Sequence, residues 1–301
     1  MNIDVLITFL SWEDRYILGL EQNIQKYNPS KVILIKNINS RTDEWKKENL
    51  QKTQDLLVDK IEIVDVDISV PQKNWVTLRD AFALHCSGRR ILIDITTMTR
   101  ETIWYSLYNC KLNKCHISYI YYKPEPEGYS PEWISRDPAK PRLLYKMSGI
   151  AKLGAPTLLL VTGGYDIQRL DNLIYNFEPN QTILFFQDGI DQRNKDNFKK
   201  CRDLFKAKYK IEMIYEYDAY DIDNCLDLIL SKLEQKDSNS NKYIDHCNII
   251  LNSLGSKTSA ITLFKLWLRH PEIALSYIPS KEYNREYSKG IGEPYFGTIE
   301  M

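Results

Sequence analysis

The first half of the chain carries a strand, loop and helix signature in Ile91–Arg100, which reads ILIDITTMTR. An apolar run ends at Asp94, and a short loop of hydroxyl side chains leads to Arg100 and a helical pattern. This order is typical of a buried parallel strand that enters a helix through a βα turn. Because the amides at a helix amino terminus attract anions, the stretch predicts a phosphate- or anion-binding loop.

A second copy of this signature lies in Ile249–Lys257, which reads IILNSLGSK. Apolar runs in the two halves recur at intervals of roughly 25–30 residues, the length of one βα unit. Their centres are Val5, Ile33, Ile63, Ile93 and Tyr119 in the first half, and Leu160, Leu184, Met213, Ile250 and Ser276 in the second. The sequence therefore predicts an α/β fold of two tandem Rossmann-like parallel-sheet units, related by internal duplication.

The two units are expected to span residues 1–142 and 143–301, because the stretch 123–142 is rich in proline and charge. Strands are expected at 3–9, 31–36, 60–66, 91–95 and 117–122, and at 157–162, 182–186, 211–217, 248–252 and 273–278. The first helix is expected to begin after an N-cap at Ser11, since a carboxylate follows three residues later.

Composition narrows the class of protein. The chain has 301 residues, with 40 basic and 40 acidic side chains, so its net charge does not favour duplex nucleic acid or an anionic membrane. No apolar stretch approaches the ~20 residues of a membrane span, and the amino terminus lacks a signal-peptide pattern. We therefore expect a cytoplasmic protein whose six cysteines are reduced and mostly buried.

Other common sites lack their signatures. We find no G-x-G-x-x-G fingerprint, no P-loop and no nucleophile triad among the four histidines, so no cofactor is expected. Cys110, Cys115 and His116 lack a partner pair at usable spacing for a metal. The acidic clusters Asp65–Asp67 and Asp218–Asp221 either hold a divalent ion or serve turn chemistry.

Ligands of an open parallel sheet collect at the carboxyl ends of its strands, where the strand order reverses. Here that edge joins the loops after strands one and four of each unit, with Thr99 and Arg100 in the first and Ser256 and Lys257 in the second. The alternative is that the hydroxyl residues simply cap helices. Tyr283, expected outside the strands, is a candidate for base stacking.

The pattern Asp94-x-Thr96-x-Met98-Thr99-Arg100 resembles the Asp-x-Thr-x-Gly-Thr-Lys loop of the CARF and SAVED families, Rossmann-like sensors of cyclic oligonucleotides in bacterial antiviral systems. Met98 stands where that pattern has glycine, and the second copy is one residue shorter. SAVED proteins are two fused CARF-like units, so the resemblance covers most of the chain.

The resemblance implies a nucleotide-type ligand held in a cleft between the two halves, and a separate effector protein as partner in antiviral defence. A homo-oligomer is compatible with it. The alternatives are a standalone nucleotide phosphodiesterase or related hydrolase with Asp94 or Glu13 as acid or base, and a non-catalytic subunit of a defence complex. The predicted ligand-binding residues are Ser11, Trp12, Glu13, Arg15, Asp94, Thr97, Thr99, Arg100, Gly163, Gly164, Asp166, Gly255, Ser256, Lys257 and Tyr283.

Overall fold

The computed structural model describes residues 2–125, 128, 130, 133–163, 166–187, 192–209, 211, 213–237 and 240–300. The chain folds into two compact units. Met1–Ile134 and Glu282–Met301 form the first unit, and Ser135–Lys281 forms the second. The predicted border lies between residues 142 and 143, whereas the chain leaves the first unit after Ile134 and rejoins it at Glu282.

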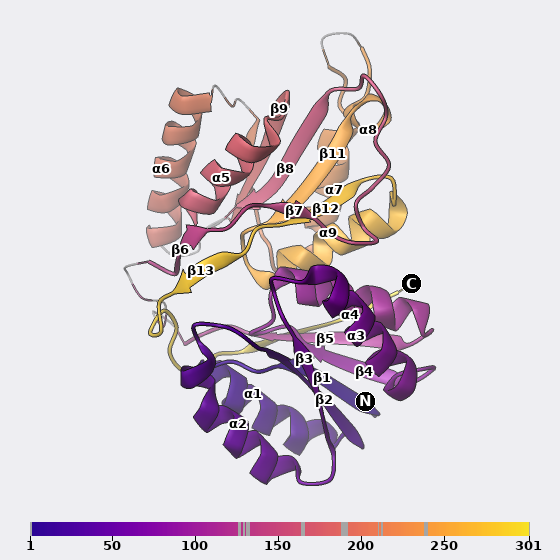
Figure 1. Cartoon of the computed structure of the whole chain (residues 1–301). Coiled ribbons are helices and arrows are strands. Elements are labelled where there is room, and N and C mark those ends of the chain that lie inside the picture. Colours follow the sequence, from indigo (N-terminus) through magenta and orange to yellow (C-terminus); the bar gives the residue numbers. More distant parts are fainter. Residues whose placement is uncertain are drawn as a thin grey trace. The chain divides into compact units, whose positions relative to one another are not determined.

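The first unit contains a six-stranded sheet in the order β14-β5-β4-β1-β2-β3 (Figure 1). Five strands are parallel, and β14 runs antiparallel to β5 at the edge. The helices α1 and α2 cover one face of the sheet, and α3 and α4 cover the other. The strands are β1 (Val5–Phe9), β2 (Lys31–Asn37), β3 (Ile61–Val66), β4 (Arg90–Asp94), β5 (His116–Tyr122) and β14 (Pro294–Ile299); the helices are α1 (Asp14–Tyr27), α2 (Asp43–Leu57), α3 (Pro71–His85) and α4 (Arg100–Leu112).

Local chemistry explains where these elements begin and end. Every residue of β1 is buried, as expected of a central parallel strand covered by helices on both faces. Helix α1 ends at Tyr27 because Asn28 adopts a left-handed conformation, with φ of 39°. Its N-cap is Glu13, whose side chain makes no capping bond, so the N-cap predicted at Ser11 is wrong.

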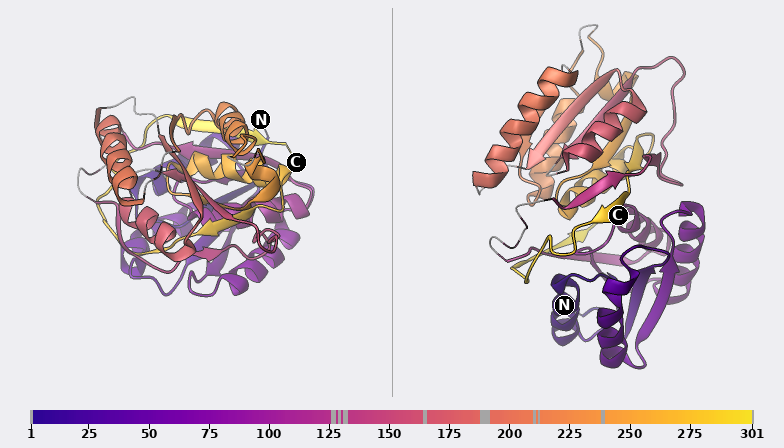
Figure 2. Two further views of the ribbon diagram at one scale, coloured as in Figure 1. Left: turned by 90° about the horizontal axis from the view of Figure 1, so that it is seen from above. Right: turned by 60° about the vertical axis from the view of Figure 1, so that its left-hand side comes forward.

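The second unit contains a sheet in the order β10-β9-β8-β11-β12-β7, with β7 antiparallel to β12. Helices α5 and α6 lie on one face of the sheet, and α7 and α9 lie on the other (Figures 1 and 2). The strands are β7 (Arg142–Leu143), β8 (Thr157–Gly163), β9 (Gln181–Gln187), β10 (Ile214–Tyr217), β11 (Asn248–Ser253) and β12 (Ala274–Tyr277); the helices are α5 (Ile167–Phe177), α6 (Gln192–Tyr209), α7 (Ile222–Leu233), α8 (Tyr243–His246) and α9 (Lys257–Arg269).

The two sheets share one strand order. In each unit the parallel strands follow the order 3-2-1-4-5, and one antiparallel strand flanks strand five. The fold class predicted from the sequence, two Rossmann-like units, is confirmed. In the first unit the flanking strand, β14, follows strand five in the sequence. In the second unit the flanking strand, β7, precedes strand one.

Each sheet packs against its helices through an apolar core. In the first unit, β1 and β2 contribute Leu6, Val32 and Leu34 to a cluster with Tyr16 and Leu20 of α1. In the second unit, Leu159 and Val161 of β8 pack with Leu170 and Leu173 of α5 and with Phe205 of α6. These cores fix the sheets, so the loops at the carboxyl ends of the strands are held by a rigid base.

Four of the strands were not predicted from the sequence. They are β7, β14, β6 (Ser135–Pro138) and β13 (Ser280–Tyr283), of which the last two form a separate two-stranded sheet. In β14 the exposed and partly buried residues alternate, and only Ile299 is buried. Tyr283, expected outside the strands, ends β13.

Candidate ligand-binding site

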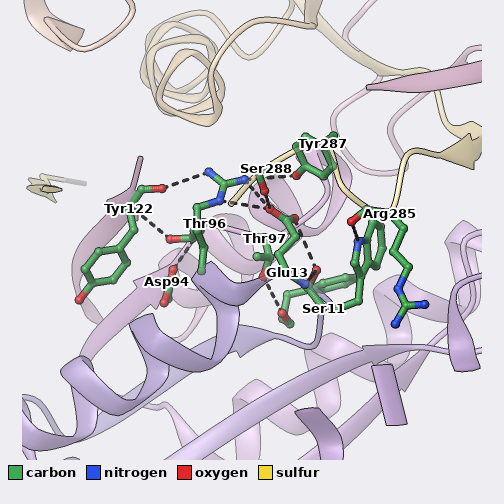
Figure 3. Close-up of polar contacts among 12 residues, drawn as sticks. Ser11, Glu13, Asp94, Thr96, Thr97, Tyr122, Arg285, Tyr287 and Ser288 are labelled. Atoms are coloured by element: carbon green, nitrogen blue, oxygen red, sulfur yellow. Dashed lines mark hydrogen bonds and ion pairs between the residues drawn. The ribbon is translucent and has the colours of Figure 1, made fainter. Parts of the chain in front are cut away.

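The carboxyl edge of the first sheet brings the loop after β4 against the end of β1. The Thr97 hydroxyl donates a hydrogen bond of 2.7 Å to the carbonyl oxygen of Phe9, the last residue of β1 (Figure 3). The neighbouring Thr96 hydroxyl accepts from the amide of Tyr122 on β5, at 3.0 Å. Strands one and four therefore meet through side-chain bonds at this edge, as the topology requires.

Asp94 lies inside this edge and is 2% exposed. One carboxylate oxygen accepts from the Thr96 amide and the other from Asn23 Nδ2 of α1, each at 3.0 Å. The Tyr122 hydroxyl in turn donates to Asn23 Oδ1 at 2.9 Å. Burial raises the pKa of Tyr122, and the charge of Asp94 adds to the increase. Asp94 thus joins β4, α1 and β5 within the unit.

The helix after this loop starts with the hydroxyl and cation that the sequence predicted. Thr99 is the N-cap of α4, and its hydroxyl accepts from the amide of Thr102 at 3.2 Å. Arg100 is the first residue of α4, and both side chains are partly exposed. The capping alternative therefore describes part of the role of Thr99, while Arg100 lies at the positive end of the helix dipole.

Glu13 and Arg15 form an ion pair in the interior of the first unit, 6% and 2% exposed. Arg15 also donates to the carbonyl oxygen of Tyr122 and to the Tyr287 hydroxyl, both at 3.2 Å. The Ser288 hydroxyl donates to Glu13 Oε2 at 2.9 Å (Figure 3). These contacts satisfy much of the hydrogen-bonding capacity of both charges, as a buried pair requires.

The partners Tyr287 and Ser288 belong to the C-terminal residues 284–292, which we call the closing segment. Its backbone pairs with the chain after β5: Gly292 donates to the Lys123 carbonyl and Lys289 to that of Gly128, each at 2.8 Å. The sequence missed the role of Ser288, because nothing local links it to Glu13, 275 positions away. The closing segment therefore covers the buried Glu13 and Arg15.

Trp12 and Tyr283 lie together in a partly exposed aromatic cluster. The ring centroid of Trp12 is 5.8 Å from that of Tyr283 and 5.3 Å from that of Trp45. The Trp12 indole donates to the carbonyl oxygen of Arg285 at 3.0 Å, and the Arg285 guanidinium lies 5.8 Å from the Trp45 ring centre. This cluster offers ring faces beside a cation, the combination that suits a flat aromatic ligand.

The second unit has an equivalent edge, made by backbone atoms. The amides of Leu254 and Gly255, after β11, both donate to the carbonyl oxygen of Thr162 on β8 at 2.8 Å. A Cβ at Gly255 would lie 2.7 Å from the Gly163 carbonyl oxygen and 3.0 Å from the Tyr217 hydroxyl. Only glycine fits this approach, so the loop lies directly on the end of strand one.

Helix α9 begins at this loop in the same way that α4 begins in the first unit. Ser256 is its N-cap, and the Ser256 side chain makes no capping bond. Lys257 is the first helical residue. Hydrogen bonds between buried hydroxyl groups connect the loop to α9 and β8. The Ser259 hydroxyl oxygen lies 2.8 Å from that of Ser253 and 3.1 Å from that of Thr162. Gly255, Ser256 and Lys257 are all partly exposed.

Asp166 closes the loop after β8. It is the N-cap of α5 and accepts from the Arg169 amide at 2.9 Å, while its other oxygen lies 2.7 Å from Arg169 Nε. The Ser135 hydroxyl also donates to Asp166. Gly164, predicted to contact a ligand, lies outside the described residues.

The predicted residues thus divide by their surroundings. Ser11, Glu13, Arg15, Asp94, Thr97 and Gly163 are buried, whereas Trp12, Thr99, Arg100, Asp166, Gly255, Ser256, Lys257 and Tyr283 are partly exposed. The partly exposed group includes the hydroxyl and cation at the start of both α4 and α9. The buried side chains hold the loops in place.

Within the described part of the chain, no group of three or more His, Cys, Asp or Glu side chains is arranged to hold a metal ion. The Asp67 carboxylate bonds to Ser69 and Asn39, and Asp221 caps α7, so both serve turns. No described helix is long and apolar enough to cross a bilayer.

No family model matches the sequence, and no curated protein does. Among solved structures, the fold is similar to that of a Type III CRISPR defence DNA nuclease activated by cyclic oligoadenylate, with a TM-score of 0.51 and 7% identity. The similarity is one of fold. It covers 87% of this chain but only 63% of the nuclease, less than two thirds of its length.

Two other structures match at a TM-score of 0.28. The cytoplasmic domain of a prokaryotic cation chloride cotransporter is 9% identical, over 95% of this chain and 99% of that domain. A universal stress protein from Archaeoglobus fulgidus DSM 4304 is 12% identical, over 91% of this chain and 96% of that protein.

Proposed function

We propose that this chain is a ligand-binding regulatory protein that senses a nucleotide-derived signal through the helix starts at its two sheet edges. One observation carries the proposal. In both units the loop after strand four donates hydrogen bonds to a backbone carbonyl at the carboxyl end of strand one, and the first residue of the following helix is a cation. A repeated cation at a helix amino terminus is suited to repeated phosphates.

The structural neighbour supports the nucleotide class of ligand. That neighbour is a defence nuclease activated by cyclic oligoadenylate, and its fold matches most of this chain. A linear or cyclic oligonucleotide would supply one phosphate to Arg100 and another to Lys257. That both edges engage a single ligand molecule stays a prediction, and a stoichiometry of one ligand per chain would support it.

The proposal includes a separate effector protein in antiviral defence. A signal reaches such a partner if the ligand binds one conformation of the sensor more tightly than another, and only by that difference in affinity. A standalone enzyme has less support, because the carboxylates of Asp94 and Glu13 are both engaged in internal hydrogen bonds.

The test is a thermal-shift screen of the purified chain against cyclic di-, tri- and tetranucleotides, linear oligoadenylates and nucleoside phosphates. At 100 times its Kd, a ligand adds about 2.7 kcal/mol to the free energy of unfolding, which raises the Tm by several degrees. No change in the Tm with any compound of the panel would contradict a nucleotide ligand.

Matched variants locate the site of any ligand found. Arg100→Gln and Lys257→Gln remove the cations at the helix starts, while Lys111→Gln and Arg269→Gln remove exposed cations from the last turns of the same helices. We expect the first pair to lose about tenfold or more in affinity, as charge-assisted phosphate contacts do, and the second pair to bind normally. Equal affinity in all four variants would remove the helix starts from the site.

A further inference from the structure

Two cysteine residues, Cys110 and Cys115, meet where helix α4 ends. The amide of Cys115 donates to the carbonyl oxygen of Cys110, and that of Lys114 to Lys111, both at 3.0 Å. Lys114 is left-handed, with φ of 53°. This bonding pattern is a Schellman motif, in which the side chains at the positions of Cys110 and Cys115 characteristically touch. Burial, and then the neighbouring Cys115 thiol, raise the pKa of Cys110 well above its ordinary value.

Cys115 has the surroundings of a reactive thiol. It is partly exposed, whereas Cys110 is buried. The neighbouring Cys110 thiol lowers the pKa of Cys115, burial opposes this effect, and the backbone amides of Arg89 and Gly88 add to the lowering. The protonated Cys115 thiol donates to the carbonyl oxygen of Cys86 at 3.1 Å. A partly exposed thiol with a lowered pKa beside a second thiol is the arrangement of redox-sensitive cysteines.

The other thiols lack these features. Cys86, Cys201 and Cys225 are buried, and burial raises their pKa values to about 12, 11 and 12. Cys247 is also buried, and its pKa is raised for the same reason. These four thiols stay protonated near neutral pH, so they serve as internal references for the reactivity of Cys115.

We propose that Cys110 and Cys115 form an oxidisable dithiol that hydrogen peroxide converts into an intrachain disulfide. The Cys115 thiolate attacks one peroxide oxygen, the O–O bond breaks and hydroxide leaves, so that Cys115 becomes a sulfenic acid. The Cys110 thiol then displaces the sulfenic oxygen: the S–S bond forms, and the oxygen leaves as water with the proton of Cys110. Two thiols are oxidised, and one peroxide is reduced to water.

The backbone geometry suits a ring between Cys110 and Cys115. The two residues are joined by a backbone hydrogen bond, which is compatible with the short Cα separation that a disulfide needs. The closed loop lies at the junction of α4 and β5, and α4 carries Arg100 at its opposite end. The dithiol is therefore separate from the proposed ligand-binding residues and is tested without any ligand.

Trypsin gives a direct test, because it cuts after Lys111 and Lys114, between the two cysteines. Reduced native protein is treated with graded hydrogen peroxide, blocked with N-ethylmaleimide and digested without reductant. We expect peptides 101–111 and 115–136 to appear as one linked species that dithiothreitol separates, since Pro124 blocks cleavage after Lys123. In the untreated protein, maleimide is expected to modify Cys115 about tenfold faster than Cys201 or Cys225.

Two variants examine the order of the steps. In Cys110→Ser, dimedone is expected to trap a sulfenic acid on Cys115, since the resolving thiol is gone. In Cys115→Ser, peptide 101–111 is expected to stay unoxidised. A link from Cys115 to Cys86, or equal oxidation of all six cysteines in the wild-type chain, would overturn the proposal. The wild-type digest decides the question even if a variant does not fold.

Discussion

The Thr97 hydroxyl lies 2.7 Å from the carbonyl oxygen of Phe9 and donates a hydrogen bond to it. At the other end of the same two strands, Asp4 receives two guanidinium bonds from Arg90, of 3.1 and 2.8 Å. Strands β1 and β4 are therefore fastened by side chains at both ends. The carboxyl-end bond also sets where helix α4 begins, and with it the position of Arg100.

Replacing Thr97 by valine keeps the shape of the side chain but leaves the Phe9 carbonyl without this donor. We expect the free energy of unfolding to fall by about 1–3 kcal/mol. Urea unfolding followed by tryptophan fluorescence measures the loss. Thr298→Val, at an exposed position of β14, is the control and should change stability little; equal stability of the two variants would argue against a structural role for the Thr97 hydroxyl.

The Asp4–Arg90 pair predicts a pH dependence. The side-chain hydrogen bonds from Arg90, then its backbone amide, lower the pKa of Asp4 from 3.8 to about 2. Because the folded pKa is depressed, the pair stabilises the fold above about pH 4, and this stabilisation is lost as the pH falls toward about 2. The stability difference between the wild type and Asp4→Asn should therefore shrink across that window. A difference that stays constant down to pH 2 would refute the assignment.

The buried pair of Glu13 and Arg15 predicts a non-additive effect. Arg15→Met alone leaves a buried carboxylate uncompensated and is expected to cost about 3–5 kcal/mol. The double variant Glu13→Gln, Arg15→Met removes both charges and should cost less than the sum of the two single changes. Chemical denaturation of the four proteins gives the coupling energy, and simple additivity would show that the pair is not coupled.

Gly255 predicts a defect confined to the second edge. Gly255→Ala would force the loop after β11 away from Gly163 and the Tyr217 hydroxyl, at a cost of about 1–3 kcal/mol. Any ligand found in the screen should then bind less tightly, as measured by calorimetry. Gly154→Ala is the comparison, since nothing lies within 4 Å of a Cβ there and the change adds only backbone strain at a φ of 74°. Undiminished binding by Gly255→Ala would exclude this loop from the site.

The parallel core was predictable because its signal is local. Ten apolar runs at the spacing of βα units indicated ten strands. Short, fully buried runs such as Val5–Phe9 are typical of parallel strands covered on both faces. Strand β14 was not predictable in the same way. Its residues alternate at a half-exposed edge and begin with a proline, and the strand pairs with β5, which lies far back in the sequence.

The starts of the two helices at the candidate site were predictable from the sequence. The closing segment that covers Glu13 and Arg15 was not. A hydroxyl followed by a cation after an apolar run indicated Thr99–Arg100 and Ser256–Lys257, because capping is a property of neighbouring residues. The N-cap at Ser11 failed because the Ser11 hydroxyl bonds to the amide and carboxylate of Glu13 instead. The bond from Ser288 to Glu13 depends on tertiary folding alone.

Strand β14 also sets an order of events during synthesis. The edge of β5 that β14 pairs with leaves the ribosome roughly 10–30 s before β14 does, at ordinary rates of translation. All of Ser135–Lys281 is made in that interval, so the second unit can fold first. Until then β5 presents an unpaired strand edge, the kind of surface that invites association with other nascent chains. The nascent chain therefore carries an open β5 edge throughout the synthesis of its second unit.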